Sequence, residues 1–221
     1  MIHVEDWRGS PALPRGICSE TKRPYFPRAW HKRLGWVVHH MGAGGTGYDI
    51  EQVNDYHRAR DWGEGARAPH IAYHVFIPWA YRGWASGRGI ALEPGADGLA
   101  VICNHHSEVS WHATRANNEF WGVGIQVDGN QDTPDEGQRA ALQHVLDGGL
   151  AAWGFAHPAS PIICGHKELG ATKPVWWTAA AAWRDYGNRT DCPGSFLMGV
   201  VGHYRQSGEI WRPAQESIGE R

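Results

Sequence analysis

Short apolar runs that end in polar or glycine-rich stretches recur along the chain and predict buried β-strands. In one of them Val123, Ile125 and Val127 alternate with small or polar residues, so the apolar side chains face one side of a sheet. The predicted strands span residues 35–40, 71–77, 98–103, 123–129 and 161–164. Helical patterns lie between several of these strands, which indicates an α/β fold.

Helices are predicted where apolar spacing coincides with capping residues. The first spans residues 49–61, with Asp49 as its N-cap. The second spans residues 134–153 and begins with a capping box, Thr133-Pro134-Asp135-Glu136, that has proline at the first helical position. A third, short and alanine-rich helix is expected over residues 178–186.

A chain of 221 residues is long enough for one domain with extensions at its ends. Residues 34–202 are expected to form this domain. Residues 1–33 contain four prolines and no clear periodicity, so they are expected to form an extended arm, and residues 203–221 a C-terminal extension. The glycine-rich stretch 79–97 predicts a loop or hairpin.

Composition narrows the possible partners and compartments. The net charge of -2 gives no indication of binding to nucleic acid or to an anionic membrane surface. No stretch has the length of a membrane span, and the N-terminus lacks the pattern of a signal peptide. Four scattered cysteines do not form a disulfide framework, so a reducing cytosol is expected. The 13 tryptophans predict an aromatic core or a groove lined with flat rings.

The candidate chemistry lies in two late stretches, Gly165-His166-Lys167-Glu168 and Asp191-Cys192-Pro193-Gly194. Their histidine and cysteine are both good zinc ligands. A third ligand is expected from His39 or His40, at the end of the first predicted strand. Because neighbours on a strand point to opposite faces, only one of the two can reach a given metal. Three protein ligands leave one tetrahedral position for water, which is the catalytic arrangement of zinc.

Several motifs follow one another in a defined order. They are Val37-Val38-His39-His40, Ala72-Tyr73-His74-Val75-Phe76-Ile77, Trp111-His112-Ala113, Gly122-Val123-Gly124-Ile125, Gly165-His166 and Asp191-Cys192-Pro193-Gly194. This order resembles that of the zinc-dependent N-acetylmuramoyl-L-alanine amidases of the type 2 family, which includes phage amidases and peptidoglycan recognition proteins. The resemblance covers roughly residues 34–200.

The resemblance implies that His39, His166 and Cys192 bind Zn2+. It implies that Tyr73 lies beside the metal as an active-site tyrosine, and that His112 is a groove histidine that meets substrate. The implied fold is a single α/β domain with a mixed central β-sheet flanked by helices and with zinc in a cleft on one sheet face. Residues 34–202 would then be the catalytic domain.

Three features depart from the family pattern. The insertion at residues 174–188 separates the second histidine from the cysteine, and its residues Trp176 and Trp177 would stack on sugar rings or cover the core. Gln126 stands where some members carry a glutamate base, so proton transfer would pass to the tyrosine or to the water that zinc activates. Thr190 replaces a lysine of phage members, and Arg189 or Lys173 would supply the positive charge. Gln126, Arg189 and Thr190 are therefore expected in the substrate-binding groove.

The predicted activity is zinc-dependent hydrolysis of the amide between N-acetylmuramic acid and L-alanine in bacterial peptidoglycan. A phage or prophage endolysin is expected, monomeric, without stable membrane association, made in the cytoplasm and acting on the wall after the membrane is breached. The alternatives are a cytosolic amidase that recycles muropeptides and a non-catalytic peptidoglycan-binding module. A general zinc peptidase is disfavoured because the chain lacks a His-Glu-x-x-His helix.

Overall fold

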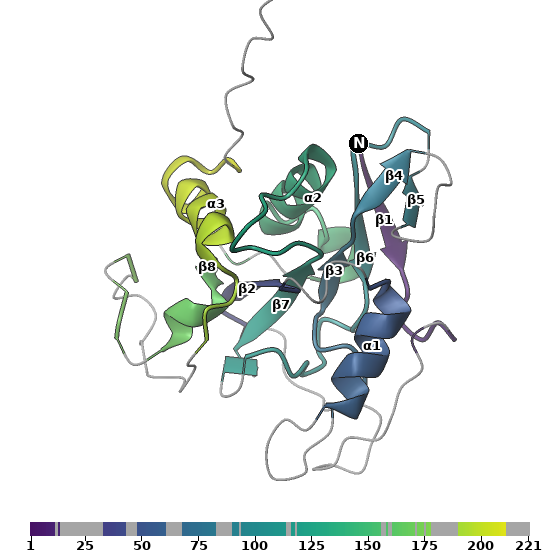
Figure 1. Cartoon of the computed structure of the whole chain (residues 1–221), viewed down its shortest axis with the longest axis horizontal. Coiled ribbons are helices and arrows are strands. Elements are labelled where there is room, and N and C mark those ends of the chain that lie inside the picture. Colours follow the sequence, from purple (N-terminus) through teal and green to yellow (C-terminus); the bar gives the residue numbers. More distant parts are fainter. Residues whose placement is uncertain are drawn as a thin grey trace, which may run out of the picture.

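Six strands form one mixed sheet at the centre of the molecule (Figure 1). Their order is β1 (Ile2–Asp6), β6 (Gly98–Ile102), β3 (Val75–Ile77), β7 (Phe120–Ile125), β2 (Gly35–His40) and β8 (Ile162–Gly165). All neighbours are parallel except β3 and β6. The computed structural model describes residues 1–11, 13, 33–42, 48–60, 68–82, 90–92, 94–113, 116–117, 119–155, 158, 161–170, 172–174, 176–177 and 190–210. The prediction of an α/β fold with a mixed sheet is confirmed.

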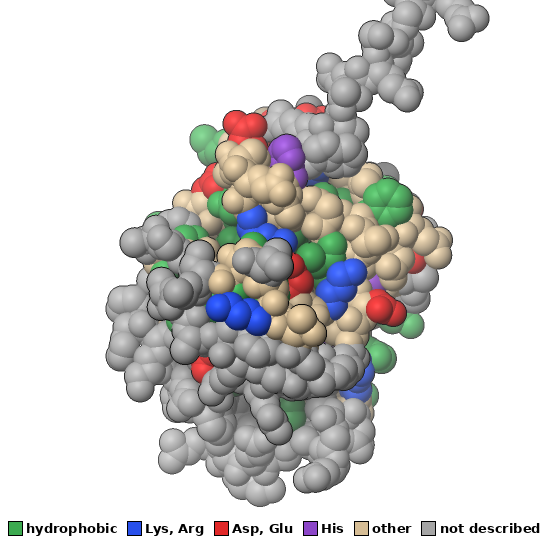
Figure 2. All heavy atoms as spheres, turned by 90° about the vertical axis from the view of Figure 1, so that its left-hand side faces the viewer, with side chains coloured by type: hydrophobic (Ala, Val, Ile, Leu, Met, Phe, Trp, Pro, Cys, Tyr) green, Lys and Arg blue, Asp and Glu red, His purple; other side chains and the backbone are tan. Residues whose placement is uncertain are grey.

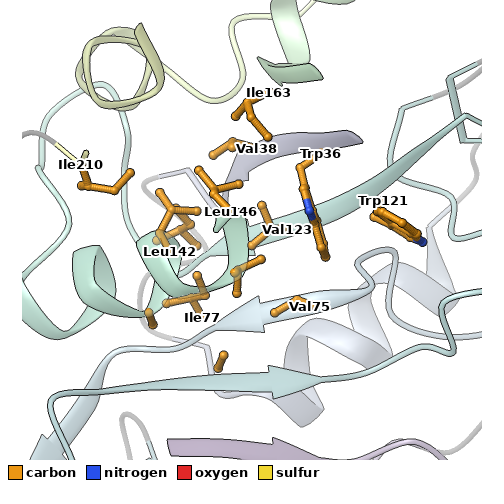
Figure 3. Close-up of a cluster of buried hydrophobic side chains, with 14 of the residues drawn as sticks. Trp36, Val38, Val75, Ile77, Trp121, Val123, Leu142, Leu146, Ile163 and Ile210 are labelled. Carbon is orange, nitrogen blue, oxygen red and sulfur yellow. The ribbon is translucent and has the colours of Figure 1, made fainter. Parts of the chain in front are cut away.

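Helices cover both faces of this sheet. On one face, side chains of α2 (Glu136–Leu146) and α3 (Ser195–Ser207) pack on the strands in one apolar cluster. Figure 3 shows Leu142 and Leu146 of α2 directed toward Val38, Val123 and Ile77 of the sheet. On the other face, α1 (Ile50–Ala59) packs on alternate side chains of β3 and β6.

Tryptophan contributes to the core on both faces. Trp36 and Trp121 lie in the cluster under α2, with ring centroids 5.3 Å apart, and Phe155 stacks on Trp36 at 5.6 Å. Trp177 is buried in a separate cluster with Phe120. Trp36, Trp121 and Trp177 therefore have the predicted core role, in which each indole buries a large apolar area.

Several predicted elements have different bounds in the structure. The strand predicted at residues 71–77 exists only as β3, and the one predicted at 123–129 is β7, which begins and ends earlier. The helix predicted at 134–153 is α2 followed by the short η3 (Ala151–Trp153). The N-cap of α2 is Asp135, whose side chain accepts a hydrogen bond from the backbone N–H of Gln138. It ends before Gly148, which adopts a positive φ.

Three predicted segments contain structure that the sequence did not indicate. The expected N-terminal arm contributes β1, an edge strand paired in parallel with β6. Helix α3 was not predicted, and it continues past the domain boundary expected at residue 202. The stretch 79–97 holds β4 (Ala80–Arg82) and β5 (Ile90–Leu92), which pair in parallel and so form no hairpin.

The short helix predicted at residues 178–186 lies outside the described residues. Among the described helices, none combines the length and apolar character that a bilayer-crossing segment requires.

Candidate metal centre

His39 lies at the carboxyl end of β2, on the sheet face that α1 covers. Its neighbour Val38 points into the opposite, apolar cluster, as strand alternation requires. The His39 side chain is 3% exposed. Burial, together with nearby His166, holds the pKa of the imidazole well below its usual range, so the ring is neutral and able to bind a metal.

His166 follows β8, which pairs in parallel with β2, so both strands deliver their histidines to the same edge of the sheet. It is the first residue of the one-turn helix η4 (His166–Leu169). The His39 and His166 ring centroids lie 4.6 Å apart. Glu168 fixes this turn, because its carboxylate accepts from Gly165 N at 2.8 Å.

Glu168 also joins the turn to two more distant parts of the chain. Its carboxylate accepts from Trp176 Nε1 at 2.7 Å and from Arg205 Nη1 of α3 at 2.7 Å. The Arg205 guanidinium lies 4.1 Å from the centre of the Trp176 ring. The start of the insertion is thus attached beside a candidate ligand, and Trp176 packs against the apolar cluster that contains Trp177.

Cys192 lies in the turn that precedes α3. Its Sγ is 3.5 Å from His39 Nδ1. Gly129 and Gly194 place this turn, since a Cβ on Gly129 would meet Pro193 O at 1.8 Å and one on Gly194 would meet Gly129 C at 2.3 Å. Only residues without a side chain allow the two backbones to cross this closely.

His40 points away from the site and supports the cysteine turn. Its Nδ1 accepts from Gly129 N at 3.0 Å, and its backbone N–H bonds to Cys192. Burial raises the pKa of the Cys192 thiol to about 12, and this N–H partly opposes the shift. A thiolate at this position therefore requires a bound cation, which disfavours Cys192 as a free nucleophile. His39 and not His40 joins the ligand set.

The donor set fits zinc. One ligand atom each of His39, His166 and Cys192 lies within 4.8 Å of the others. Tetrahedral zinc with bonds of about 2.1 Å to nitrogen and about 2.3 Å to sulfur would separate such a nitrogen and sulfur by about 3.6 Å. The observed separation of His39 Nδ1 and Cys192 Sγ is 3.5 Å. Two imidazoles and one thiol leave a fourth position for water.

Tyr73 lies beside these ligands, with its ring centroid 5.3 Å from that of His39. It precedes β3 in a segment whose backbone is held by side chains: Asn54 Oδ1 accepts from Ile71 N, and His57 Nδ1 accepts from Ala72 N. Asn104 donates to the Ile71 and Tyr73 carbonyls. For residues 71–73 these contacts take the place of strand pairing, and the strand predicted at residues 71–77 is shorter in the structure.

Glycines in β7 make room for two rings on this face. A Cβ on Gly124 would lie 2.4 Å from the Tyr73 ring, and one on Gly122 would lie 2.6 Å from the His112 ring. Their neighbour Val123 packs in the cluster on the other face. The Gly-Val-Gly-Ile motif therefore combines an apolar side with a side left open for site residues.

His112 is placed behind His39 and is 4% exposed. Its Nδ1 lies 3.0 Å from His39 Nε2, and its Nε2 lies 3.2 Å from Phe120 O. The expected groove histidine is therefore buried in contact with a candidate ligand. Burial lowers its pKa to about 3, so the ring is neutral. Its contact with substrate stays a prediction.

The other residues predicted for the groove make backbone contacts. Gln126 is 5% exposed, its Oε1 accepts from Trp79 N at 2.9 Å and its Nε2 donates to Tyr48 O. Thr190 Oγ1 accepts from Cys192 N at 3.1 Å, which helps to orient the cysteine. Arg189 lies outside the described residues, and Lys173 is exposed. Binding of substrate by Gln126, Thr190 and Arg189 stays a prediction.

Lys and Arg side chains gather on the side of the molecule where β8 and α3 lie (Figure 2).

Sequence reasoning missed Glu168, Asn54, His57 and Asn104 as supports of the site. Only Glu168 carries a local signal, because it stands three residues after Gly165 in the spacing of a capping box. The other three act on backbone that is distant in the sequence, and no local pattern reports such contacts.

Comparisons with known proteins agree with this geometry. The profile of a family described as N-acetylmuramoyl-L-alanine amidase matches residues 29–195, a range that includes all three candidate ligands. No curated protein matches the chain in sequence.

Solved structures share the fold at low sequence identity. The Ph2119 endolysin of a Thermus scotoductus bacteriophage has a TM-score of 0.56 and 19% identity, covering 91% of this chain and 97% of its own. Wild-type Drosophila PGRP-LB has a TM-score of 0.57 and 15% identity, over 92% and 95%. The amidase LysC of Clostridium intestinale has a TM-score of 0.51 and 16% identity, over 82% and 91%. At these identities the similarity concerns the fold.

Proposed function

The chain belongs to the N-acetylmuramoyl-L-alanine amidase family, and we propose that it hydrolyses the amide between N-acetylmuramic acid and L-alanine in bacterial peptidoglycan. One observation carries the proposal: His39, His166 and Cys192 come together from three distant parts of the chain as a set that fits zinc. The family supplies the reaction, and the intact ligand set favours an enzyme over a module that only binds.

The target bond is an unactivated amide, so both the water and the carbonyl must be activated. When bound, zinc lowers the pKa of a coordinated water to about 7 and polarises a carbonyl oxygen. The protein residues then have to hold the substrate against this site and stabilise the charge that develops. His39, His166 and Cys192 fix the position of the reaction on the α1 face of the sheet.

Tyr73 is assigned the role of hydrogen-bond donor to the developing oxyanion. Its ring lies against His39, and burial raises the pKa of its hydroxyl far above its ordinary value. A phenol that stays protonated donates a hydrogen bond to an oxyanion. The side-chain contacts that hold the backbone of residues 71–73 support this role, since they fix the position from which the Tyr73 side chain extends.

Gln126 is assigned a supporting role and not that of a base. An amide has no site that takes up a proton at neutral pH, and both of its polar atoms already bond backbone at residues 48 and 79. It holds these two segments together at the edge of the sheet where the site lies.

We further propose that the biological role is that of a phage or prophage endolysin, which reaches the wall after the membrane is breached. The similarity of the fold to a bacteriophage endolysin supports this role. A muropeptide-recycling amidase would use the same chemistry on small soluble fragments. The size of the substrate separates these two roles.

The test is digestion of purified peptidoglycan by the full chain, with and without a chelator, followed by mass spectrometry. Chelator-sensitive release of stem peptides with a new L-alanine amino terminus is expected, with His166→Ala as the inactive control. If the protein cleaves soluble muropeptides but not intact peptidoglycan, the proposed role of endolysin is wrong and that of a muropeptide-recycling amidase replaces it. Binding without cleavage by the zinc-loaded protein would overturn the amidase assignment.

A further inference from the structure

A chain of three hydrogen-bonding groups extends from the interior of the protein to the metal site. It begins at the carbonyl oxygen of Phe120, which lies 3.2 Å from His112 Nε2. The other ring nitrogen of His112 lies 3.0 Å from His39 Nε2. The remaining nitrogen of His39, Nδ1, faces Cys192 Sγ at 3.5 Å.

The direction of these bonds follows from the first acceptor. A carbonyl oxygen only accepts, so His112 Nε2 carries a proton. In a neutral imidazole the other nitrogen then has a lone pair, and His112 Nδ1 accepts. Its partner must donate, which places the proton of His39 on Nε2. His39 Nδ1 then keeps its lone pair, which faces Cys192 and can bind a metal ion held between the two residues.

Arg33 fixes the origin of this chain. Its guanidinium is 4% exposed, and Nη1 donates to the same Phe120 carbonyl at 2.8 Å. It also donates to the carbonyls of Asn117 and Glu108. Three bonds to backbone hold the cation and the carbonyl in place.

We propose that His112 is a positioning residue that selects the Nε2–H tautomer of His39 and thereby leaves His39 Nδ1 free to bind the metal. The proposal rests on the zinc site described above and deepens it. Metal-binding histidines commonly donate their second N–H to a carboxylate, a carbonyl or water, and this contact fixes tautomer and ring orientation. Here a second imidazole, itself fixed by a carbonyl, takes that place.

Two amide substitutions separate the two ends of the His112 ring. His112→Asn retains a polar acceptor at the position of Nδ1, beside His39. His112→Gln retains a donor near the position of Nε2, beside Phe120, and loses the acceptor. Both variants are neutral and polar, so they differ mainly in which contact survives.

The experiment measures zinc affinity by competition with a chromophoric chelator, and the His39 tautomer in metal-free protein by long-range ¹H–¹⁵N NMR. In the wild type the His39 proton is expected on Nε2. His112→Gln is expected to weaken zinc binding about 10- to 100-fold and to lose this tautomer preference. His112→Asn is expected to keep both close to wild type.

Three results would overturn the proposal: a wild-type His39 proton on Nδ1, equal zinc affinity of His112→Gln and wild type, or equal losses in both variants. Thermal unfolding of the metal-free variants shows whether a change in affinity comes from loss of folding. If the wild type binds no zinc, the proposed function fails, and the tautomer measurement still decides the role of His112.

Discussion

The two faces of the central sheet are built from different kinds of side chain. Under α2 and α3 the strands present a continuous apolar cluster that includes Val38 and Val123. On the opposite face the same strands present His39 and the two glycines that leave room for the rings of Tyr73 and His112. Adjacent residues of one strand thus serve different purposes, because strand side chains alternate between faces.

The comparison shows how buried polar side chains of a site can be kept in fixed positions by hydrogen bonds. Buried polar groups are costly unless their hydrogen bonds are satisfied. On the site face these bonds run between side chains and backbone, from Asn54, His57 and Asn104 to residues 71–73. The apolar face supplies stability through burial, and the polar face supplies a fixed arrangement of functional groups.

Removal of a ligand is the largest expected effect and tests the site face directly. His166→Ala and Cys192→Ala are each expected to lose bound zinc and to lower amidase activity at least about a thousandfold, since a metal contributes several kcal/mol of transition-state stabilisation. Metal content by atomic emission and turnover of purified peptidoglycan are the measurements. His105→Ala, an exposed histidine distant in sequence from the ligands, is the matched control. Full activity in either ligand variant would remove that residue from the set.

A core substitution tests the apolar face. Leu142 is fully buried in the cluster under α2. Leu142→Ala is expected to lower the free energy of unfolding by about 2–5 kcal/mol, because it leaves a cavity, while zinc affinity of the folded protein stays unchanged. Urea unfolding of metal-free protein and chelator competition measure the two quantities. A parallel loss of zinc affinity would show that the two faces are not independent.

Local patterns predicted the parts of the fold whose causes are local. Strands β2, β6 and β8 appear as apolar runs, and α1 appears with the N-cap Asp49 that its spacing indicated. The start of α2 was misjudged because Thr133 and Asp135 both offer capping patterns, and Asp135 forms the cap. The sequence pattern did not predict helix α3, because Gly199 and Gly202 interrupt its helix-forming sequence.

The residue types indicated the ligand set and the family resemblance selected His39, but the contacts that support these ligands join parts of the chain that are distant in the sequence. The apolar content of residues 71–73 is typical of a strand, yet their backbone is hydrogen-bonded by side chains of α1 and by Asn104. The cysteine turn depends on the close approach of Gly129 and Gly194, which are far apart in the sequence. His112 was assigned to a groove, and only the three-dimensional structure places it against His39.

Tyr73→Phe separates chemistry from metal binding on the site face. The variant keeps the ring that packs against His39 and His57 and loses only the hydroxyl. Zinc content is expected to stay at the wild-type level, and kcat to fall about 10²- to 10³-fold, the usual cost of one oxyanion donor. Tyr204→Phe, which removes a hydroxyl of α3 that donates to Asp147 at the end of α2, is the control and should keep wild-type turnover. Equal turnover in both variants would contradict the role of Tyr73.

The smallest expected effect concerns the insertion, whose first residues are attached next to His166 through Glu168. Trp176→Phe removes the Nε1–H bond to Glu168 and leaves an aromatic ring for Arg205 to contact. A single hydrogen bond contributes about 0.5–1.5 kcal/mol, and Glu168 keeps its bonds to Gly165 and Arg205. The free energy of unfolding should therefore fall by about 1 kcal/mol with zinc affinity unchanged, as measured by urea unfolding and chelator competition. If zinc affinity fell instead while stability held, the insertion would act on the turn that carries His166 and would belong functionally to the site face.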